Sequence, residues 1–313
     1  MKAHLVIICF APDSVRENLA SEFNVDYLAD LDARAAFFAT THAGVEIVLT
    51  NGTRGISAAE VDRLPDLKLV GAFGAGYENI DAKALRAKGI AVTHGPGTNS
   101  KAVADHAMAL LLASARHIVP MNQIVQQGGW STANYQWPCV YGKRLGILGL
   151  GRIGMEIARR GQGFDLEIAY HNRSARDDVA FAYHDSLLSL AAWSDFLICA
   201  GPGGPATQHM VNGPVLAALG ASGIVVNIGR GSIIDTAALV EALENDIIGG
   251  AGLDVLDGEP TIPDAIIGLK NLIVTPHVAG RAPEASVAKY DLFVKNVRLC
   301  LSGQPVATPV PDA

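Results

Sequence analysis

Residues 145–154 read LGILGLGRIG and place Gly149, Gly151 and Gly154 in the spacing G-x-G-x-x-G. The motif follows an apolar, strand-like run and precedes the helical pattern MEIARR, so the sequence predicts a strand, a tight turn and a helix. Glycines in such a turn let the backbone approach a pyrophosphate, and the helix N-terminus offers unpaired N–H groups to it. The motif alone is weak in a chain with 33 glycines, but its place between strand and helix favours dinucleotide binding over a plain turn.

Outward from this motif, short β-branched runs alternate with amphipathic stretches, which is typical of parallel α/β architecture. The predicted strands are residues 4–9, 45–49, 67–72, 90–93, 144–148, 166–170, 196–199, 224–227, 250–254 and 272–274. Gly and Pro at residues 95–97 and 280–283 interrupt the chain before long helical patterns. We therefore expect one discontinuous domain from residues 1–98 and 284–313, and a dinucleotide-binding Rossmann domain from residues 99–283.

Composition excludes several classes of protein. Half of the 313 residues are hydrophobic and 18% are charged, which is far from the composition of a disordered chain. The net charge of −7 opposes nucleic-acid binding, and four distant cysteines without a CxxC pair indicate neither a disulfide framework nor a metal site. The apolar stretch at residues 102–119 carries Asp105 and Arg116, which argues against a membrane span. We expect a globular cytoplasmic protein without nucleic-acid, membrane or metal partners.

The end of the next predicted strand bears on the choice of dinucleotide. Enzymes that use NAD usually carry an acidic residue there for the ribose hydroxyls, whereas residues 168–174 read IAYHNRS. Arg173 could pair with a 2′-phosphate, and Asn172 and Ser174 could donate hydrogen bonds to its oxygens. The sequence therefore favours NADPH, with NADH as the weaker cofactor, over the alternative that Arg173 is merely a solvated loop residue.

Ionisable residues stand at three further predicted strand ends. Arg230 follows the strand at 224–227, Glu259 comes shortly after the strand at 250–254, and His277 comes just after the strand at 272–274. Each alone could be structural, but together they supply what reduction of a 2-keto acid requires. Arg230 would bind the carboxylate or keto oxygen, and His277 would protonate the developing alkoxide while Glu259 holds the imidazole.

These motifs resemble those of the D-isomer-specific 2-hydroxyacid dehydrogenases over nearly the whole chain. The matching segments are residues 145–154, 201–202 with Thr207, 227–235, 252–260 and 275–277. The resemblance implies an α/β protein of two Rossmann-like domains, one flavodoxin-like and substrate-binding and one dinucleotide-binding, with parallel sheets and a cleft between them. It assigns catalysis to Arg230, Glu259 and His277, and contact with the nicotinamide carboxamide to Asp254.

The resemblance also implies a substrate loop at residues 74–81, where backbone N–H groups of Ala75 and Gly76 would hold the substrate carboxylate and Tyr77 would line the pocket. With the motifs above, the predicted cofactor site comprises Val103, Gly149, Gly151, Arg152, Ile153, Gly154, Asn172, Arg173, Ser174, Pro202, Thr207, Ile228 and Asp254. The predicted substrate site comprises Ala75, Gly76, Tyr77, Arg230 and His277.

Two segments depart from the family pattern. Residues 201–205 read GPGGP where Pro-Leu-Thr-Pro is usual, which we expect to loosen that edge of the cofactor site. Arg281 stands where a small or hydroxyl residue is common. It could bind a polar or acidic tail on the substrate, or it could face solvent.

The acid-free strand end resembles the glyoxylate and hydroxypyruvate reductase branch, and it implies NADPH-dependent reduction of a small 2-keto acid to the D-2-hydroxy acid. A reductase of 2-ketogluconate or of an aryl pyruvate is the alternative within the family. A C-terminal-binding corepressor, which uses dinucleotide occupancy to control assembly without turnover, is the alternative from another class. The helix at 101–115 and the aromatic segment at 126–141 imply a homodimer by the same resemblance.

Overall fold

The computed structural model describes residues 2–130 and 136–311, and the chain divides into two compact units. Met1–Asn99 and Arg281–Ala313 form one, which we call the five-stranded unit, and Ser100–Gly280 form the other, the seven-stranded unit. Both are α/β with wholly parallel sheets, as the alternating sequence pattern predicts. The roles of the two predicted domains in binding substrate and cofactor stay predictions at this point.

The five-stranded unit has a flavodoxin-like sheet with the order β2-β1-β3-β4-β5. Its strands are β1 (His4–Ile7), β2 (Asn24–Tyr27), β3 (Val45–Thr50), β4 (Leu69–Ala72) and β5 (Ala91–Thr93). Its helices are α1 (Asp13–Glu22), α2 (Leu31–Phe38), α3 (Ala58–Val61), α4 (Ala82–Ala87) and α11 (Pro283–Leu301). The strand order reverses between β1 and β3, which makes their carboxyl ends the switch point of this sheet.

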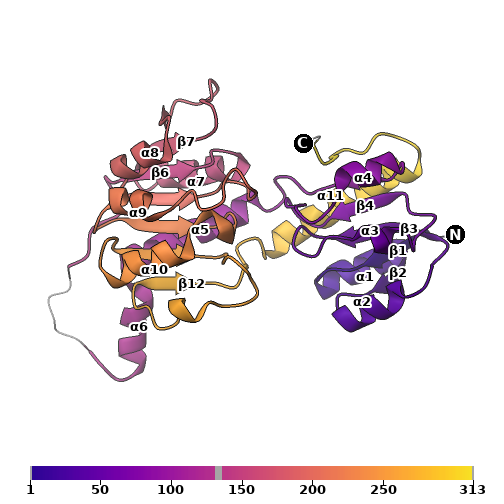
Figure 1. Cartoon of the computed structure of the whole chain (residues 1–313), viewed down its shortest axis with the longest axis horizontal. Helices are drawn as coiled ribbons and strands as arrows, with labels where there is room; N and C mark the ends of the chain where they lie inside the picture. Colours follow the sequence, from indigo (N-terminus) through magenta and orange to yellow (C-terminus); the bar gives the residue numbers. More distant parts are fainter. Residues whose placement is uncertain (1, 131–135, 312–313) are drawn as a thin grey trace. The chain divides into compact units, whose positions relative to one another are not determined.

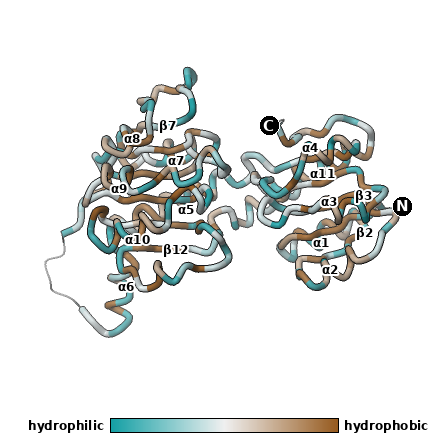
Figure 2. The backbone as a smooth tube through the Cα atoms, in the orientation of Figure 1, coloured by the Kyte–Doolittle hydropathy of each residue, from teal (hydrophilic) through white to brown (hydrophobic). Residues whose placement is uncertain are grey.

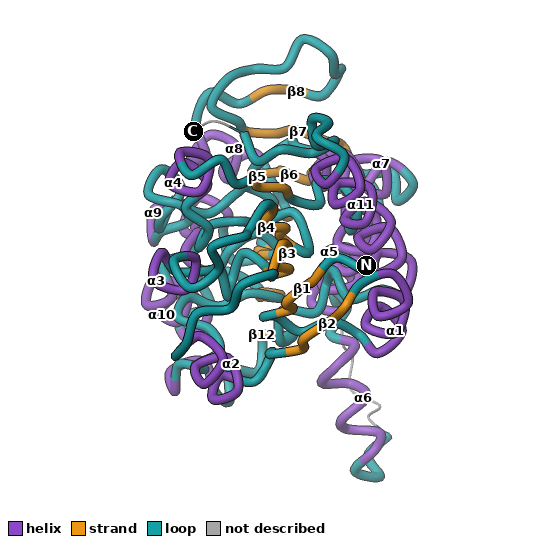
Figure 3. The backbone as a smooth tube through the Cα atoms, turned by 90° about the vertical axis from the view of Figure 1, so that its right-hand side faces the viewer, coloured by secondary structure: helices purple, strands orange, loops and turns teal. Residues whose placement is uncertain are grey.

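Helices cover both faces of the five-stranded sheet, and α1 and α11 lie on the face opposite to α3 and α4 (Figure 3). On the first face, Leu19 and Val297 pack with Ile7 and Leu49 in one apolar cluster. Because both faces are buried, the central strands are hydrophobic without alternation, as Figure 2 shows by their brown colour.

The seven-stranded unit has the order β12-β11-β10-β9-β6-β7-β8, with its switch point between β6 and β9. Figure 1 labels β6, β7 and β12 of this sheet. Its strands are β6 (Arg144–Leu148), β7 (Glu167–His171), β8 (Ala182–Tyr183), β9 (Phe196–Cys199), β10 (Ile224–Asn227), β11 (Gly250–Leu253) and β12 (Leu272–Val274). Its helices are α5 (Ser100–Ala115), α6 (Ile118–Gln126), α7 (Arg152–Gln162), α8 (Leu187–Trp193), α9 (Gly213–Leu219) and α10 (Thr236–Glu244), with 3₁₀ turns at Gly231–Ile233 and Asp264–Ile266.

The structure corrects the sequence pattern in two places. The short strands β2 and β8 were not predicted, because neither has a buried apolar run and both are defined by backbone pairing at a sheet edge. The apolar stretch at 102–119 is not one helix, because His117 adopts a left-handed φ of 50° and α6 departs from α5 at 65°. Among the described residues no single helix has the length and apolar character to cross a membrane, although this bent pair passes that test when taken together.

Candidate active site

The glycine loop between β6 and α7 has the geometry that a bound dinucleotide needs. Gly149 has a φ of 95°, and a Cβ there would stand 2.6 Å from the backbone nitrogen of Gly201. A Cβ on Gly154 would collide with the carbonyl oxygen of Gly149, so this glycine allows close packing of helix on strand. A Cβ on Gly151, the N-cap of α7, would meet nothing within 4 Å. The loop is thus tight where it turns and open where a pyrophosphate would approach, so these residues fit a dinucleotide.

The loop after β7 holds the glycine loop in place through both backbone groups of Leu150. The Leu150 N–H donates to Oδ1 of Asn172 at 2.7 Å, and the Leu150 carbonyl accepts from Nη1 of Arg176 at 2.7 Å. Arg173 and Ser174 lie between these two residues in the chain and are exposed. Arg176 is not among the predicted site residues, although it stands as a second arginine three residues after Arg173.

His277 and Glu259 form a direct pair, with 2.5 Å between Nδ1 and Oε1. His277 comes shortly after β12, and Glu259 belongs to the loop after β11, so two adjacent strands bring the pair together. The second carboxylate oxygen of Glu259 accepts from the backbone N–H of Leu256 at 3.3 Å. Since Glu259 occupies Nδ1, Nε2 is the imidazole nitrogen left to exchange a proton with a substrate.

The electrostatics of Glu259 favour its ionised form. Burial raises the pKa of this carboxyl, but the hydrogen bond and charge of His277, the N–H of Leu256 and the charge of Arg230 outweigh burial. The pKa of Glu259 therefore lies below its usual value. A carboxylate at this position offers a permanent negative charge to an imidazolium at neutral pH.

The loop that carries His277 is tied to the buried carboxylate of Asp254, which is 1% exposed. Its Oδ1 accepts from the Thr275 hydroxyl at 2.5 Å and from the Val278 N–H at 2.9 Å, and its Oδ2 accepts from the Ala279 N–H at 2.9 Å. The N–H of His277 donates to the Asp254 carbonyl at 2.8 Å. Nε2 of His106 lies 3.4 Å from the same Oδ1, so a nitrogen from α5 also faces this carboxylate.

His106 on α5 completes this network, with its Nε2 at 2.8 Å from the Thr275 hydroxyl oxygen. The backbone of His277 itself is left-handed, with a φ of 52°, which is uncommon for a residue with a side chain. Such a conformation persists where the surrounding contacts hold it. The sequence motifs pointed to Asp254 and His277, but nothing in the local pattern marked His106 or Thr275 as their supports.

Arg230 stands on a turn that a buried asparagine shapes. Asn227 is 1% exposed, its Nδ2 donates to the Arg230 carbonyl at 2.9 Å, and its Oδ1 accepts from the Gly229 N–H at 3.0 Å. The Arg230 guanidinium donates through Nη1 to the Gly229 carbonyl at 2.8 Å. The strand end of β10 and this turn therefore set the direction in which the arginine leaves the sheet.

The glycine-rich loop at residues 201–205 has a packing role that the sequence did not suggest. A Cβ on Gly203 would lie 2.7 Å from Cγ and 3.2 Å from Cβ of Arg230, so a side chain there would displace the arginine. The Thr207 hydroxyl closes the loop by donating to the Pro202 carbonyl at 2.8 Å. The structure thus places Gly203 at the close approach of Arg230, and the expectation that these glycines loosen the cofactor edge stays a prediction.

We expect Gly203→Ala to lower kcat/KM for the keto acid by about ten- to a hundredfold, because displacement of a positioned group by about 1 Å has effects of this size. The Kd of the dinucleotide, measured by fluorescence titration, should change little. Gly213→Ala is the matched control, because a Cβ on Gly213 meets open space. Equal kcat/KM values for the two variants would show that Arg230 can move to accommodate the added methyl group without loss of activity.

The remaining predicted cofactor residues follow strand ends of the seven-stranded unit, apart from one. Arg152 and Ile153 open α7 after β6, and Ile228 directly follows β10 and is 6% exposed. Val103 lies instead on α5 and is 4% exposed. Within the described residues, no three His, Cys, Asp or Glu side chains gather as a metal site would require.

The predicted substrate loop lies in the five-stranded unit, directly after β4. The Gly74 carbonyl accepts from the Gly95 N–H at 2.6 Å, and Nδ1 of His94 lies 3.0 Å from the Ala75 carbonyl. Tyr77 packs edge-on against His94, with 5.2 Å between ring centroids. No backbone hydrogen bond between described residues uses the N–H of Ala75 or Gly76, so both remain available to an anion.

The chain resembles known proteins over most of its length. The family model "D-isomer specific 2-hydroxyacid dehydrogenase, NAD binding domain" matches residues 108–279. The chain is 36% identical to hydroxyphenylpyruvate reductase of Plectranthus scutellarioides over 98% of each chain. It is 35% identical to glyoxylate/hydroxypyruvate reductase A of Arabidopsis thaliana, again over 98% of each.

Solved structures show the same likeness. A 2-hydroxyacid dehydrogenase from Ketogulonicigenium vulgare Y25 has a TM-score of 0.91 and 34% identity, with 99% of each chain covered. An NADPH-dependent glyoxylate/hydroxypyruvate reductase from Sinorhizobium meliloti, solved with NADP and malonate, has a TM-score of 0.82 and 34% identity. That comparison covers 99% of this chain and 97% of the other.

Proposed function

The chain belongs to the D-isomer specific 2-hydroxyacid dehydrogenase family, and from this premise we propose that it reduces a small 2-keto acid of the glyoxylate or hydroxypyruvate type to the D-2-hydroxy acid with NADPH. Membership makes it an NAD(P)-dependent 2-keto acid reductase, and the proposal adds the substrate type and the preferred cofactor. The observation that supports it most directly is the Glu259–His277 pair on a loop held by Asp254.

The proposed chemistry assigns one task to each side chain. A bound reduced nicotinamide supplies the hydride that reaches the keto carbon. The Arg230 guanidinium binds the carboxylate and polarises the keto oxygen, which draws electron density away from that carbon. His277 donates the proton on Nε2 to the developing alkoxide, and the Glu259 carboxylate stabilises the imidazolium before transfer. Ala75 and Gly76 hold the substrate carboxylate through their N–H groups.

The preference for NADPH rests on the end of β7. The exposed Arg173 and Ser174 are available to a 2′-phosphate, and Asn172 keeps its amide N–H₂ group as a donor because Leu150 uses only its oxygen. No acidic residue stands at positions 171–174 to accept from the ribose hydroxyls of NADH. NADH is therefore proposed as the weaker cofactor.

Arg173→Ala should raise the KM for NADPH about ten- to a hundredfold, because a charge-assisted contact with the phosphate is lost. The KM for NADH should stay nearly constant, since NADH has no such phosphate. Steady-state kinetics with both cofactors measure the difference. Arg159→Ala on α7 is the control, because Arg159 pairs with Glu156 on the surface of the same unit. Equal changes for the two cofactors would contradict the assignment.

A panel of glyoxylate, hydroxypyruvate, phenylpyruvate and 2-ketogluconate, each tested with NADPH and NADH, examines the reaction itself. Rapid turnover of glyoxylate or hydroxypyruvate supports the proposal, whereas a preference for one of the other two favours the alternatives within the family. Relatives bear the names hydroxyphenylpyruvate reductase and 2-ketogluconate reductase, the latter from Gluconobacter oxydans at 36% identity. Tight dinucleotide binding without any turnover would favour the non-catalytic, corepressor-like protein.

We also propose that the enzyme acts in the cytoplasm as a homodimer. Helix α6 has no buried residue and exposes Ile118, Val119 and Val125. It projects away from the sheet of the seven-stranded unit in both views (Figures 1 and 3). A second copy would cover this apolar helix. Of the aromatic segment predicted to take part, residues 131–135 lie outside the described residues.

A further inference from the structure

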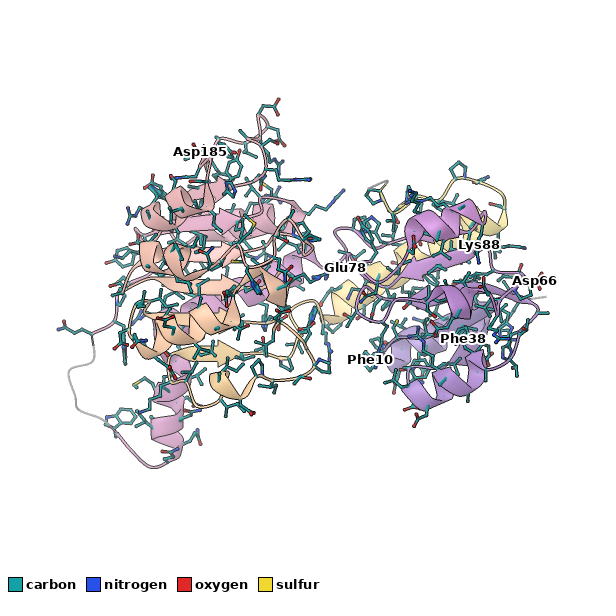
Figure 4. All side chains as sticks on the ribbon, in the orientation of Figure 1. Phe10, Phe38, Asp66, Glu78, Lys88 and Asp185 are labelled. Atoms are coloured by element: carbon teal, nitrogen blue, oxygen red, sulfur yellow. The ribbon has the colours of Figure 1, made fainter. Side chains whose placement is uncertain are left out.

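The switch point of the five-stranded sheet is the position that its topology favours for a ligand. In doubly wound sheets, ligands bind outside the carboxyl ends of the strands where the strand order reverses, which here means the ends of β1 and β3. The substrate loop at residues 74–77 follows β4, the strand next to β3. In Figure 4 the labelled Phe10 and Glu78 lie at this end of the unit, whereas Asp66 and Lys88 lie at the opposite end.

Two basic side chains at this edge each lie over an aromatic ring. The guanidinium carbon of Arg281 is 5.8 Å from the ring centroid of Phe10, which comes just after β1 and is 63% exposed. Nζ of Lys289, in the second turn of α11, is 5.8 Å from the ring centroid of Phe73, directly after β4. We refer to Arg281 and Lys289 as the basic pair.

The two members of the basic pair act on each other. Burial lowers the pKa of Lys289, and the positive charge of Arg281 lowers it further. The charge of Cys9 raises this pKa but does not outweigh the other two effects. The N-terminus of α11 adds the positive end of a helix dipole, and its N-cap residue Ala282 makes no side-chain cap. The two positive charges therefore repel one another, and an anion bound between them would offset the repulsion.

Other charged residues near this edge carry both signs. Arg34 donates to both carboxylate oxygens of Glu60 at 2.7 and 2.9 Å. Arg54 lies on the turn after β3, and the Glu78 carboxylate lies over the same turn, because a Cβ on Gly52 would collide with it. Arg54 and Glu78 thus contribute opposite charges, and Glu284 adds a negative charge in the first turn of α11.

We propose that the basic pair binds a second anionic group of the substrate, so that the preferred substrates are 2-keto acids whose tail ends in a carboxylate or a phosphate. This inference rests on the proposed reduction of a 2-keto acid and specifies the tail. The substrate's own carboxylate would occupy the N–H groups of Ala75 and Gly76 on the same sheet edge. Phe10 and Phe73 would flank the carbon chain between the two anions.

Two matched substrate pairs test this with the full-length enzyme and its reduced cofactor. 2-Oxoglutarate is compared with 2-oxopentanoate, and 3-phosphohydroxypyruvate with hydroxypyruvate, so that each pair differs in one terminal anion. We expect kcat/KM to favour the anionic member of at least one pair by about tenfold or more. The preference should shrink as ionic strength rises from about 0.05 M to about 0.5 M, because salt screens an exposed charge. A preference within the first substrate pair indicates a carboxylate tail, and a preference within the second indicates a phosphate tail.

Arg281→Gln should reduce this preference about tenfold, whereas Arg281→Lys, which keeps the charge, should retain most of it. Arg63→Gln is the control, because Arg63 is an exposed arginine of the same unit outside this edge, and it should leave the ratio unchanged. Equal use of anionic and neutral members, or an unaltered ratio in Arg281→Gln, would overturn the tail assignment and leave the proposed reduction intact. Absence of turnover with every keto acid would instead overturn the proposed function, and this inference with it.

Discussion

Replacement of Arg230 by glutamine is expected to lower kcat/KM for the keto acid by about 10²- to 10³-fold, the effect of removing a donor to developing negative charge. Arg230 is the only arginine on the turn after β10, and the buried Asn227 fixes that turn. We expect kcat to fall and the KM for the keto acid to rise, because the guanidinium would contact both the bound substrate and the transition state.

Two measurements make the Arg230 result specific. The Kd of NADPH should stay within about twofold, because the glycine loop and the end of β7 lie on other strands, and a tenfold loss in Kd would equal 1.4 kcal/mol. Arg230→Lys should recover only part of the activity, because a lysine lacks the two-pronged guanidinium that matches a carboxylate. Unchanged turnover in Arg230→Gln would remove this residue from the proposed mechanism.

Replacement of His277 by glutamine should lower kcat by about 10²- to 10⁴-fold, the usual contribution of a general acid. Glutamine can still donate to Glu259 and so keeps the loop near its place, but it has no proton to release to the alkoxide. The KM for the dinucleotide should change little. If turnover stays within a few-fold of the natural enzyme, the proton comes from another group or from water.

Glu259 acts through His277 and is a positioning residue. Reduction needs a proton on Nε2 of His277, and Glu259 holds that imidazole through Nδ1, so Glu259→Gln should lower kcat while the Kd of the dinucleotide stays nearly constant. The depressed pKa of Glu259 keeps it ionised as pH falls through its ordinary value of about 4.3, so its own protonation should produce no acid limb above that pH. A kcat equal to that of the natural enzyme would show that Glu259 does not position the proton donor.

The lowered pKa of Glu259 also makes the stability of the folded protein depend on pH. A carboxyl group whose pKa is lower in the folded state contributes stability that is present above its unfolded pKa and is lost as pH falls through the folded pKa. Glu259 therefore stabilises the folded state at neutral pH, and this contribution disappears in acid. Glu259→Gln should lower stability at neutral pH and make stability less dependent on acid pH.

Much of the site followed from local sequence. The glycine loop at residues 149–154 and the strand ends before Arg230 and His277 were predictable, because the backbone needs of a tight turn and the apolar run of a buried strand are written within a few residues. The order of the motifs then identified the family, and the comparisons confirmed it. The same local logic failed for β2, whose four residues carry no buried apolar run.

The sequence by itself determined which residue types stand at the strand ends, whereas the tertiary structure decided what surrounds them. His106 and Thr275 are 169 positions apart and meet only because α5 packs on the sheet, and Gly203 matters only because Arg230 passes beside it. Arg281 likewise became interpretable once its guanidinium was found over Phe10. Turns and strands depend on interactions between near neighbours in the chain, but contacts between distant side chains depend on how the packed core brings their elements together.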